Sequence, residues 1–528
     1  MNLRQIEPGL YVAGQVTVDD IDAIVAIGIR SLICNRPDAE EPGQPAFATI
    51  AEAAHARGIE TVYLPIGGDY TVEAQANAFA GALAKMPSPI LAFCRTGNRS
   101  EKVTNAARAA QIQAQAPRRS SAHHKVVIAG GGSAGIATAA SLLKRNPHLD
   151  IAVIEPCESH YYQPGFTMVG GGVFKQPDTI RPMRAVMPKG VTWIRNAASG
   201  FDPDNNTVRL ASGEDVTYDV LIVAMGNRLA WEKIEGLEAT LGRNGVTSNY
   251  RYDLAPYTWQ LVQDLKRQPG TKRALFSQPP MPIKCAGAPQ KAMYLSCSEW
   301  ESSGVLSQFE VEFHNAGGVL FGVPEYVPAL METVERYGIH LKFGSTLIAV
   351  DGPGKTATFR TETGEITRSF DMLHAVPAQE GNPVVAHSVL ADTAGYVEVD
   401  QNTLRHLRWG NVFSLGDGCS TPNAKTAAAA RKQAPVCAVN VLAALEGKDP
   451  VASYDGYGSC PLTVDRGHIV LAEFTYGGKV APTLPKWLIE GTRPSRMAWH
   501  LKADGLPPIY WHGMLKGREW LVPPAPLL

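Results

Sequence analysis

The feature that most constrains the fold is a glycine turn between an apolar run and a helix-forming run. Residues 125–129 are mostly apolar, residues 130–132 are all glycine, and helix-forming residues begin just after Gly135. This pattern predicts a strand, a tight turn and a helix. Gly130 would permit the turn, Gly132 would let the backbone approach a pyrophosphate, and Gly135 would let helix and strand pack closely.

A second apolar run, residues 151–154, favours a dinucleotide-binding domain. It ends at Glu155, about twenty residues after Gly135, where a carboxylate can accept hydrogen bonds from an adenosine ribose. A glycine turn in an ordinary α/β domain is the alternative interpretation.

Length and composition bound the domain count and the partners. A chain of 528 residues exceeds what one hydrophobic core usually organises, so we expect roughly two to four domains. The net charge of -1 gives no reason to expect nucleic-acid binding. Early acidic residues argue against a signal peptide and no apolar run is long enough to span a membrane, so we expect the protein inside the cell. Eight scattered cysteines do not form a disulfide framework, and those with a role are expected to be catalytic or redox-active.

Residues 1–110 alternate apolar runs with helical patterns and predict a compact α/β domain. Its first chemical feature is the loop 94–100, in which Cys94 follows a predicted strand and precedes a glycine turn and a helix. Backbone N–H groups and the helix dipole stabilise a thiolate at such a position, and Arg99 can bind an anion. A buried, inert cysteine in a tight turn is the alternative. The predicted strands are at 9–14, 31–35, 60–65 and 89–93, and the helices at 18–27, 45–57 and 72–85.

The layout of this domain, including residues 35–38 after a strand, resembles a dual-specificity-phosphatase-like domain. The loop departs from the phosphatase pattern, because one residue fewer separates Cys94 from Arg99 and Phe93 stands where phosphatases carry histidine. It is similar instead to the active loop of single-domain rhodaneses. We therefore favour sulfur transfer through a Cys94 persulfide over phosphate-ester hydrolysis.

Residues 111–124 are small and polar, lack apolar periodicity and are expected to form a linker. Beyond it, residues 219–226 and 411–417 repeat the design of a buried strand that ends in a glycine turn, and the second segment carries Asp417. In flavoproteins with two dinucleotide-binding domains, an aspartate at this place lies beside the ribityl chain of FAD. An aromatic, glycine-rich loop at 160–172 could close over a flat cofactor or belong to the core.

Two cysteine-containing segments, residues 282–291 and 416–429, carry the most specific pattern. From Lys125 onward the chain resembles the sulfide:quinone oxidoreductases, in the branch that includes the mitochondrial enzymes. The shared stretches include 162–164, 284–291, 425–429 and 454–457.

The resemblance implies that Cys285 and Cys419 form a redox-active pair beside the flavin, bridged by a disulfide or by an extra sulfur atom. Sulfide attacks the bridge, Cys419 carries the persulfide, and Cys285 is freed as a thiolate that reduces FAD. Lys284 could lower the pKa of Cys285 or be a solvated neighbour. The remaining cysteines are expected to be structural: Cys34, Cys157, Cys297, Cys437 and Cys460, with Cys157 the least certain.

The glycine pattern and the resemblance together give the residues expected to hold FAD, and no metal site is expected. The substrates implied are sulfide and quinone, with a thiol or sulfite as sulfur acceptor. The segment 308–322 lies where a reductase would carry a second glycine fingerprint, but its glycine spacing is wrong, so electrons are not expected from NAD(P)H. The FAD residues are Gly130, Gly131, Gly132, Gly135, Glu155, Gln163, Ala198, Asp417, Lys425, Thr426 and Ala427.

Residues 481–528 form an amphipathic C-terminal segment in which tryptophans alternate with basic residues. Such a segment suits the headgroup boundary of a bilayer, or it could dock on the protein's own core. In the family that the chain resembles, this end dips into the membrane and admits quinone. We therefore expect peripheral attachment on the cytoplasmic side of a membrane.

The prediction is thus an α/β enzyme: an N-terminal phosphatase-like domain (1–110), a linker, a flavoprotein with two Rossmann-like domains (125–480), and the C-terminal segment. A tether would raise the local concentration of a sulfur donor at its acceptor. Two alternatives stay open for the first domain: a protein-tyrosine-phosphatase-like hydrolase and a non-catalytic binding module. The sequence leaves open the sulfur acceptor, the quinone type and whether the protein is a homo-oligomer.

Overall fold

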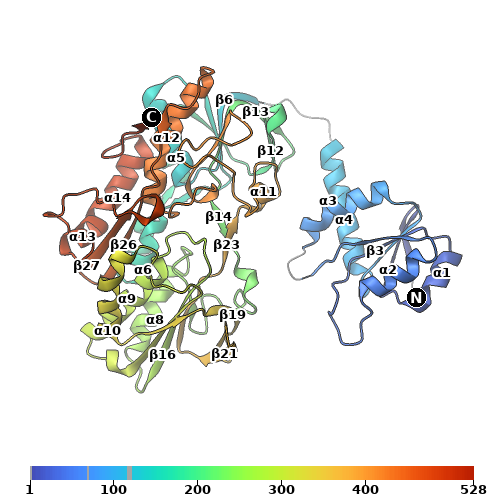
Figure 1. Cartoon of the computed structure of the whole chain (residues 1–528), viewed down its shortest axis with the longest axis horizontal. Coiled ribbons are helices and arrows are strands. Elements are labelled where there is room, and N and C mark those ends of the chain that lie inside the picture. The colour runs from blue at the N-terminus through green and yellow to red at the C-terminus, as the bar shows by residue number, and fades with distance from the viewer. Residues whose placement is uncertain (1–2, 68–70, 116–121, 528) are drawn as a thin grey trace. The chain divides into compact units, whose positions relative to one another are not determined.

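The computed structural model describes residues 3–67, 71–115 and 122–527, and the chain divides into two compact units, Met1–Arg118 and Arg119–Leu528. Each unit is an α/β structure, as predicted (Figure 1). The predicted linker 111–124 differs from the structure at both ends. Helix α4 (Asn98–Gln115) continues into it because alanine and glutamine favour helices, and strand β6 begins at Ala122. The rest of the predicted linker, 116–121, lies outside the described residues.

The described part of the first unit contains a five-stranded sheet in the order β1-β2-β5-β3-β4. Strand β1 pairs antiparallel with β2, and the other neighbours pair in parallel. Because β3 and β5 run parallel as neighbours, their carboxyl ends and the loops that follow them lie at the same edge of the sheet. The strands are β1 (Leu3–Glu7), β2 (Leu10–Ala13), β3 (Ser31–Cys34), β4 (Glu60–Tyr63) and β5 (Ile90–Phe93).

The central strand β5 is buried on both faces, which explains its unbroken apolar sequence. Leu91 and Phe93 belong to a core with α1 and α2, whereas Ile90 and Ala92 belong to a core with α3 and α4. Helices therefore cover both faces of the sheet (Figure 1). The helices are α1 (Ile21–Ala26), α2 (Phe47–His55), α3 (Val72–Lys85) and α4.

The described part of the second unit begins with a seven-stranded sheet in the order β10-β7-β6-β13-β12-β11, with β24 also paired to β13. The long strand β13 pairs through its first residues with β12 and through Leu221, Ile222 and Val223 with β24. The predicted strand, glycine turn and helix are β6 and α5 (Ser133–Arg145), and α5 packs beside α12 (Ala427–Leu445). The strands are β6 (Ala122–Ala129), β7 (Ile151–Ile154), β10 (Val191–Ile194), β11 (Ala198–Asp202), β12 (Thr207–Leu210), β13 (Asp215–Val223) and β24 (Val412–Ser414).

A second, fully parallel sheet has the order β15-β22-β16-β17-β18 and lies at the other end of this unit (Figure 1). Its central strand is β16, and the turn that follows it, residues 279–287, carries Cys285. Its elements are β15 (Val246–Thr247), β16 (Lys272–Gln278), β17 (Phe309–Asn315), β18 (His340–Phe343) and β22 (Met372–His374), with helices α8 (Ala255–Leu265), α9 (Ala288–Ser302) and α10 (Val327–Tyr337).

The segment 308–322, expected at the place of a second fingerprint, consists mainly of β17 and the loop after it. The turn after the central strand β16 holds the cysteine loop. That electrons do not come from NAD(P)H stays a prediction.

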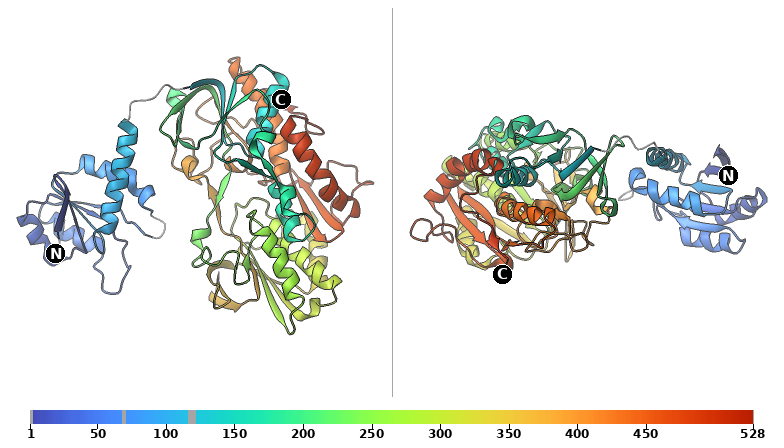
Figure 2. Two further views of the ribbon diagram at one scale, coloured as in Figure 1. Left: turned by 180° about the vertical axis from the view of Figure 1, so that it is seen from behind. Right: turned by 90° about the horizontal axis from the view of Figure 1, so that it is seen from above.

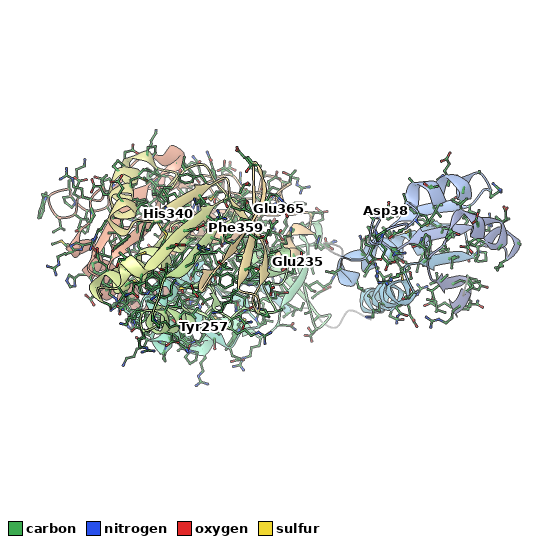
Figure 3. All side chains as sticks on the ribbon, turned by 90° about the horizontal axis from the view of Figure 1, so that it is seen from below. Asp38, Glu235, Tyr257, His340, Phe359 and Glu365 are labelled. Atoms are coloured by element: carbon green, nitrogen blue, oxygen red, sulfur yellow. The ribbon has the colours of Figure 1, made fainter. Side chains whose placement is uncertain are left out.

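Two smaller β elements pack against the second sheet and its helices. Phe359 on β20 (Thr356–Thr361) is labelled in Figure 3. It stacks on His314 of β17, with ring centroids 3.6 Å apart, and so joins the three-stranded sheet β19-β20-β21 to the parallel sheet. The hairpin of β26 (Gly458–Asp465) and β27 (His468–Phe474) packs against α9. The other two strands are β19 (Thr346–Asp351) and β21 (Gly364–Ser369).

The C-terminal segment is divided between the core and the surface. Helical turns after α13 (Arg496–His500) bury Tyr510, Trp511 and Leu515 in the core that contains α5 and α12, as the two views of Figure 2 show for these helices. Trp487 is 83% exposed, and Trp520 and other apolar side chains of the segment are also exposed. Among the described helices, none combines the length and the apolarity that crossing a bilayer requires.

Candidate active sites

The glycine turn after β6 has the shape that a dinucleotide site needs. Gly130 has a φ of +107°, and a side chain at Gly135 would overlap the Gly130 carbonyl oxygen, so the turn and the close packing both require glycine. At Gly132 the space is open, since a Cβ there would meet no atom within 4 Å. The residues therefore fit a pyrophosphate against the N-terminus of α5.

Glu155 lies at the end of β7, as predicted, and faces this turn. Its carboxylate accepts hydrogen bonds from the N–H groups of Gly131 and Cys157, each at 2.8 Å. A carboxylate has acceptor capacity left after two such bonds, so a ribose hydroxyl can still bind. Ala198 is buried at the first position of β11, opposite Leu210.

The two cysteine loops of the second unit meet through Lys425. The backbone N–H of Cys285 donates to the Lys425 carbonyl at 2.8 Å, and the Lys425 ammonium group donates to the Cys419 carbonyl, also at 2.8 Å. Thr426 caps helix α12, its hydroxyl accepting from the Ala429 N–H, and Ala427 is the first residue of that helix. Residues predicted from separate motifs are thus joined in one site.

The sulfur of Cys285 lies beside a thiol and an ammonium group. Cys460 Sγ is 3.7 Å away and Lys291 Nζ is 3.1 Å away, and Lys291 is itself buried. The hydrogen bond from Cys460 and the charge of Lys291 hold the pKa of Cys285 well below its usual range, although burial opposes them. Cys285 also has a φ of +51°, in the left-handed region that few non-glycine residues adopt.

Cys460 was expected to be structural, and the structure places it in the site instead. Sequence reasoning missed Cys460 because it lies on β26, far along the chain, and no local pattern links it to Cys285. Lys291 had a signal in the sequence, since it lies in the stretch 284–291 that carries the family resemblance. Its burial, in the first turn of α9, is seen only in the structure.

Cys419 is buried, and its thiol lies 3.0 Å from the Thr421 hydroxyl and 3.3 Å from the Gly416 carbonyl oxygen. Asp417, two residues before it, is half-buried. Burial raises the pKa of Asp417, against the opposing pull of the Lys284 and Lys425 ammonium groups. The pairing of Cys285 with Cys419 stays a prediction.

Lys284 directs its ammonium group to Gln163 and not to the neighbouring Cys285 sulfur, contrary to the interpretation in which it lowers the pKa of Cys285. Its ammonium group donates to the Gln163 side-chain oxygen at 3.0 Å. Gln163 lies in a short helical turn that leads into α6 (Phe166–Gly170), so the predicted aromatic loop at 160–172 is largely helical. The Gln379 side-chain oxygen accepts hydrogen bonds from the Lys284 N–H and from the Asn227 side chain. The other polar atoms of these two side chains, Gln379 Nε2 and Asn227 Oδ1, are buried and have no hydrogen-bond partner among the described residues, which suits an additional polar group here.

A further lysine, from the C-terminal segment, interacts electrostatically with the same sulfurs. Lys502 is buried and donates to the Pro164 carbonyl at 2.9 Å. Burial and the nearby charge of Lys291 lower the pKa of Lys502 to about 7, while Cys285 and Cys460 act in the opposite direction.

The Cys94 loop of the first unit has the predicted geometry. Cys94 follows β5 and is buried, and its sulfur accepts a hydrogen bond from the Gly97 N–H at 3.1 Å, directly before α4. Gly97 has a φ of +89°, so this N–H direction depends on glycine. The sulfur therefore faces backbone N–H at the N-terminus of an 18-residue helix.

The guanidinium group of Arg99 is engaged within its own unit. It donates to the Ile66 carbonyl at 2.8 Å and forms an ion pair with Glu40. Glu40 also pairs with Arg36, at 2.8 Å, in the loop that contains Asp38 (Figure 3). An anion that binds Arg99 must compete with the Glu40 carboxylate.

The remaining cysteines have the properties of structural or unreactive thiols. Burial raises the pKa of Cys34 to about 12 and, together with Glu155, the pKa of Cys157 to about 11. Burial also raises the pKa values of Cys297 and Cys437. Among the described residues, no three His, Cys, Asp or Glu side chains are grouped so as to hold a metal ion.

Comparison with known proteins separates the same two parts of the chain. Residues 2–111 match the family described as beta-lactamase hydrolase-like protein, phosphatase-like domain, and residues 124–258 match the pyridine nucleotide-disulphide oxidoreductases. The first match confirms the predicted phosphatase-like domain. A beta-lactamase hydrolase-like protein of Agrobacterium fabrum is 36% identical over 100 residues, which are 19% of this chain and 23% of that protein.

The second part has relatives that match over most of their length. The mitochondrial sulfide:quinone oxidoreductase of Dictyostelium discoideum is 37% identical over 84% of this chain and 94% of that protein. The crystal structure of the sulfide:quinone oxidoreductase from Aquifex aeolicus superposes with a TM-score of 0.61, at 20% identity, over 76% of this chain and 92% of that one. The fold is therefore shared, and the identity to the first relative shows that the chain belongs to the sulfide:quinone oxidoreductase family.

Proposed function

We propose that the second unit binds FAD and oxidises sulfide, passing the electrons to a quinone. Gly130, Gly132 and Gly135 would receive the pyrophosphate, Glu155 the ribose, and Asp417 the ribityl chain, with Gly131, Gln163, Ala198, Lys425, Thr426 and Ala427 lining the remainder. When bound, FAD supplies a two-electron acceptor that quinone can reoxidise. The open space at Gly132 and the unpartnered polar atoms near Lys284 support this assignment.

Sulfide chemistry is assigned to Cys285 and Cys419. Sulfide attacks their bridge, Cys419 keeps the sulfane sulfur as a persulfide, and Cys285 leaves as a thiolate. The observation that carries this proposal is the environment of Cys285, since a buried ammonium group 3.1 Å from its sulfur stabilises the leaving thiolate. The hydrogen bonds of Lys425 to both loops support the proximity of the two cysteines.

The first unit is proposed to transfer the sulfane sulfur through a persulfide on Cys94. The short loop and the N–H that Gly97 directs at the sulfur suit a sulfur anion. A thiol or sulfite would then take the sulfur, with Arg99 binding the anionic acceptor. The proposal places the protein peripherally on the cytoplasmic side of a membrane, with exposed apolar side chains of the C-terminal segment, such as Trp487 and Trp520, at the lipid surface.

The test is an anaerobic titration of the purified full-length protein with sulfide, followed by the flavin absorbance. We expect sulfide to bleach the flavin, a soluble quinone to restore it, and NADH to act poorly. Cys157→Ser, a change at an exposed cysteine, is the matched control for Cys285→Ser and Cys419→Ser. Rapid bleaching by NADH with no response to sulfide would contradict the proposal and indicate a nicotinamide-dependent reductase.

A further inference from the structure

The thiol that contacts Cys285 in the described part of the chain is Cys460. The two sulfur atoms are 3.7 Å apart, and Lys291 Nζ lies 3.1 Å from the first and 3.8 Å from the second. One ammonium group can thus donate hydrogen bonds to both sulfurs. This arrangement joins the turn after β16 to strand β26, which lies 175 residues further along the chain.

The close approach of these sulfurs depends on a glycine in the cysteine loop. A Cβ at position 287 would lie 2.6 Å from Cys460 Sγ and would also overlap Leu462. Only glycine leaves room there for the Cys460 sulfur against the loop. The close approach of Cys460 to Cys285 therefore depends on Gly287 in the loop that carries Cys285.

We propose that Cys460 is a third working thiol of the site, which attacks Cys285 in its bridge to Cys419 and forms a Cys285–Cys460 disulfide. This inference rests on the bridge of the proposed function. One S–S bond forms between Cys460 and Cys285, and the bond from Cys285 to its bridge partner breaks. Cys419 departs as a thiolate, or as a persulfide where the bridge holds an extra sulfur, and takes up the proton that Cys460 loses. No electrons leave the protein, so the exchange needs no oxidant.

The charges around Cys460 favour attack when Cys285 is bridged. The hydrogen bond to the Cys285 thiolate is the largest cause that raises the pKa of Cys460, followed by burial, whereas Lys291 lowers it. A bridged Cys285 carries no negative charge, so the largest of these causes disappears and Lys291 stays. Attack then requires the sulfurs to close from 3.7 Å to the length of a disulfide, about 2.05 Å.

The exchange gives the site a way to release its sulfur. A persulfide on Cys419 becomes free for an acceptor while Cys285 stays oxidised, so no second sulfide is needed for release. Cys460 thereby acts as a resolving thiol.

The experiment maps disulfides in the full-length protein as purified with its flavin. The protein is oxidised with a soluble quinone in the absence of sulfide, its free thiols are blocked with N-ethylmaleimide, and a digest without reductant is analysed by mass spectrometry. We expect a peptide linking Cys285 to Cys460 beside one linking Cys285 to Cys419. The first is lost in Cys460→Ser and kept in Cys437→Ser, a matched change at another buried thiol.

The outcomes separate this inference from the proposed function. A Cys285–Cys419 link with Cys460 fully blocked would overturn the inference alone, whereas absence of that link together with a wild-type flavin that sulfide does not bleach would overturn the proposed function. If Cys460→Ser does not fold, Cys419→Ser is treated with diamide, a diazene that takes two electrons and two protons from a pair of thiols. A Cys285–Cys460 link is then expected, and a Cys460 that stays free would refute the proposal.

Discussion

Cys285 and Cys94 both follow the end of a parallel strand and precede a helix, yet different groups surround their sulfur atoms. Cys285 has a buried ammonium group and a second thiol beside it. Cys94 has a backbone N–H from Gly97 and the N-terminus of α4. Arg99 was expected to supply a positive charge near Cys94, but its guanidinium group is paired with Glu40.

The difference shows which kind of positive charge stabilises the sulfur anion in each loop. A full charge in a buried site is weakly screened and shifts a pKa strongly, which suits a thiolate that must leave a disulfide. Partial charges from N–H groups act only at close range and suit a sulfur anion held in a small cradle. Arg99 and Glu40 are partly exposed, so their pair is weak enough for an anion to compete.

The largest effect is expected from substituting Cys285 and Cys94, because each change should abolish a different activity. Cys285→Ser should lower the rate of sulfide-dependent flavin reduction by about a thousandfold or more, because it removes the exchangeable sulfur. Cys94→Ser should leave this rate unchanged and abolish thiosulfate:cyanide transfer by the full-length protein. Stopped-flow absorbance measures the first activity and thiocyanate formation the second. Robust phosphatase activity that is lost with Cys94→Ser, without any sulfur transfer, would instead favour the hydrolase interpretation.

The flavin dependence of the two sites should differ as well. Gly132→Val should weaken FAD binding by roughly a hundredfold, since the side chain fills space the pyrophosphate needs at a cost of about 1–3 kcal/mol. The protein should still fold, because a Cβ there meets no atom within 4 Å. Circular dichroism checks folding, and the yellow absorbance checks the cofactor. Sulfur transfer at Cys94 should persist in this colourless variant; its loss would mean that the sites depend on each other.

Removing the buried charge should make Cys285 resemble an ordinary cysteine. Lys291→Met raises the pKa of Cys285, because the ammonium group that stabilises the thiolate is gone. Below the new pKa, each unit of increase lowers the thiolate fraction about tenfold, so alkylation and flavin reduction slow and their pH profiles move to higher pH. The rate of iodoacetamide labelling between neutral and alkaline pH measures this. Lys284→Met, whose ammonium group binds Gln163, is the control and should leave the profile in place.

The smallest effect is expected at the Arg99 pair. Glu40→Gln removes the carboxylate that competes with an anion, and a partly exposed pair of this kind contributes about 0.2–1 kcal/mol, so anion affinity should rise by a factor of about 1.4 to 5. The KM for thiosulfate measures the change. Glu41→Gln, which removes a partner of Arg36 and Arg95 but not of Arg99, is the matched control. An unchanged KM would mean that Glu40 does not limit access to Arg99.

Much of this architecture could be predicted from the sequence because its signals are local. The strand, glycine turn and helix from residue 122 to 145, the strand that ends at Glu155 and the Cys94 loop each lie within one short stretch, where backbone sterics and apolar periodicity decide the conformation. The same holds for helix α3, whose predicted limits agree with the structure. The family resemblance likewise rests on short motifs around Cys285 and Cys419.

Only the tertiary structure decided what faces these local features. Cys460 contacts Cys285 from another strand, and Lys502 of the C-terminal segment interacts electrostatically with the same sulfurs. Glu40 pairs with Arg99, which lies 59 residues further along the chain. Trp511 could have faced lipid, but it packs against α5 and α12. The physical reason is that burial and charge pairing depend on which surfaces the packed elements bring together, and the spacing of residues along one element does not contain that information.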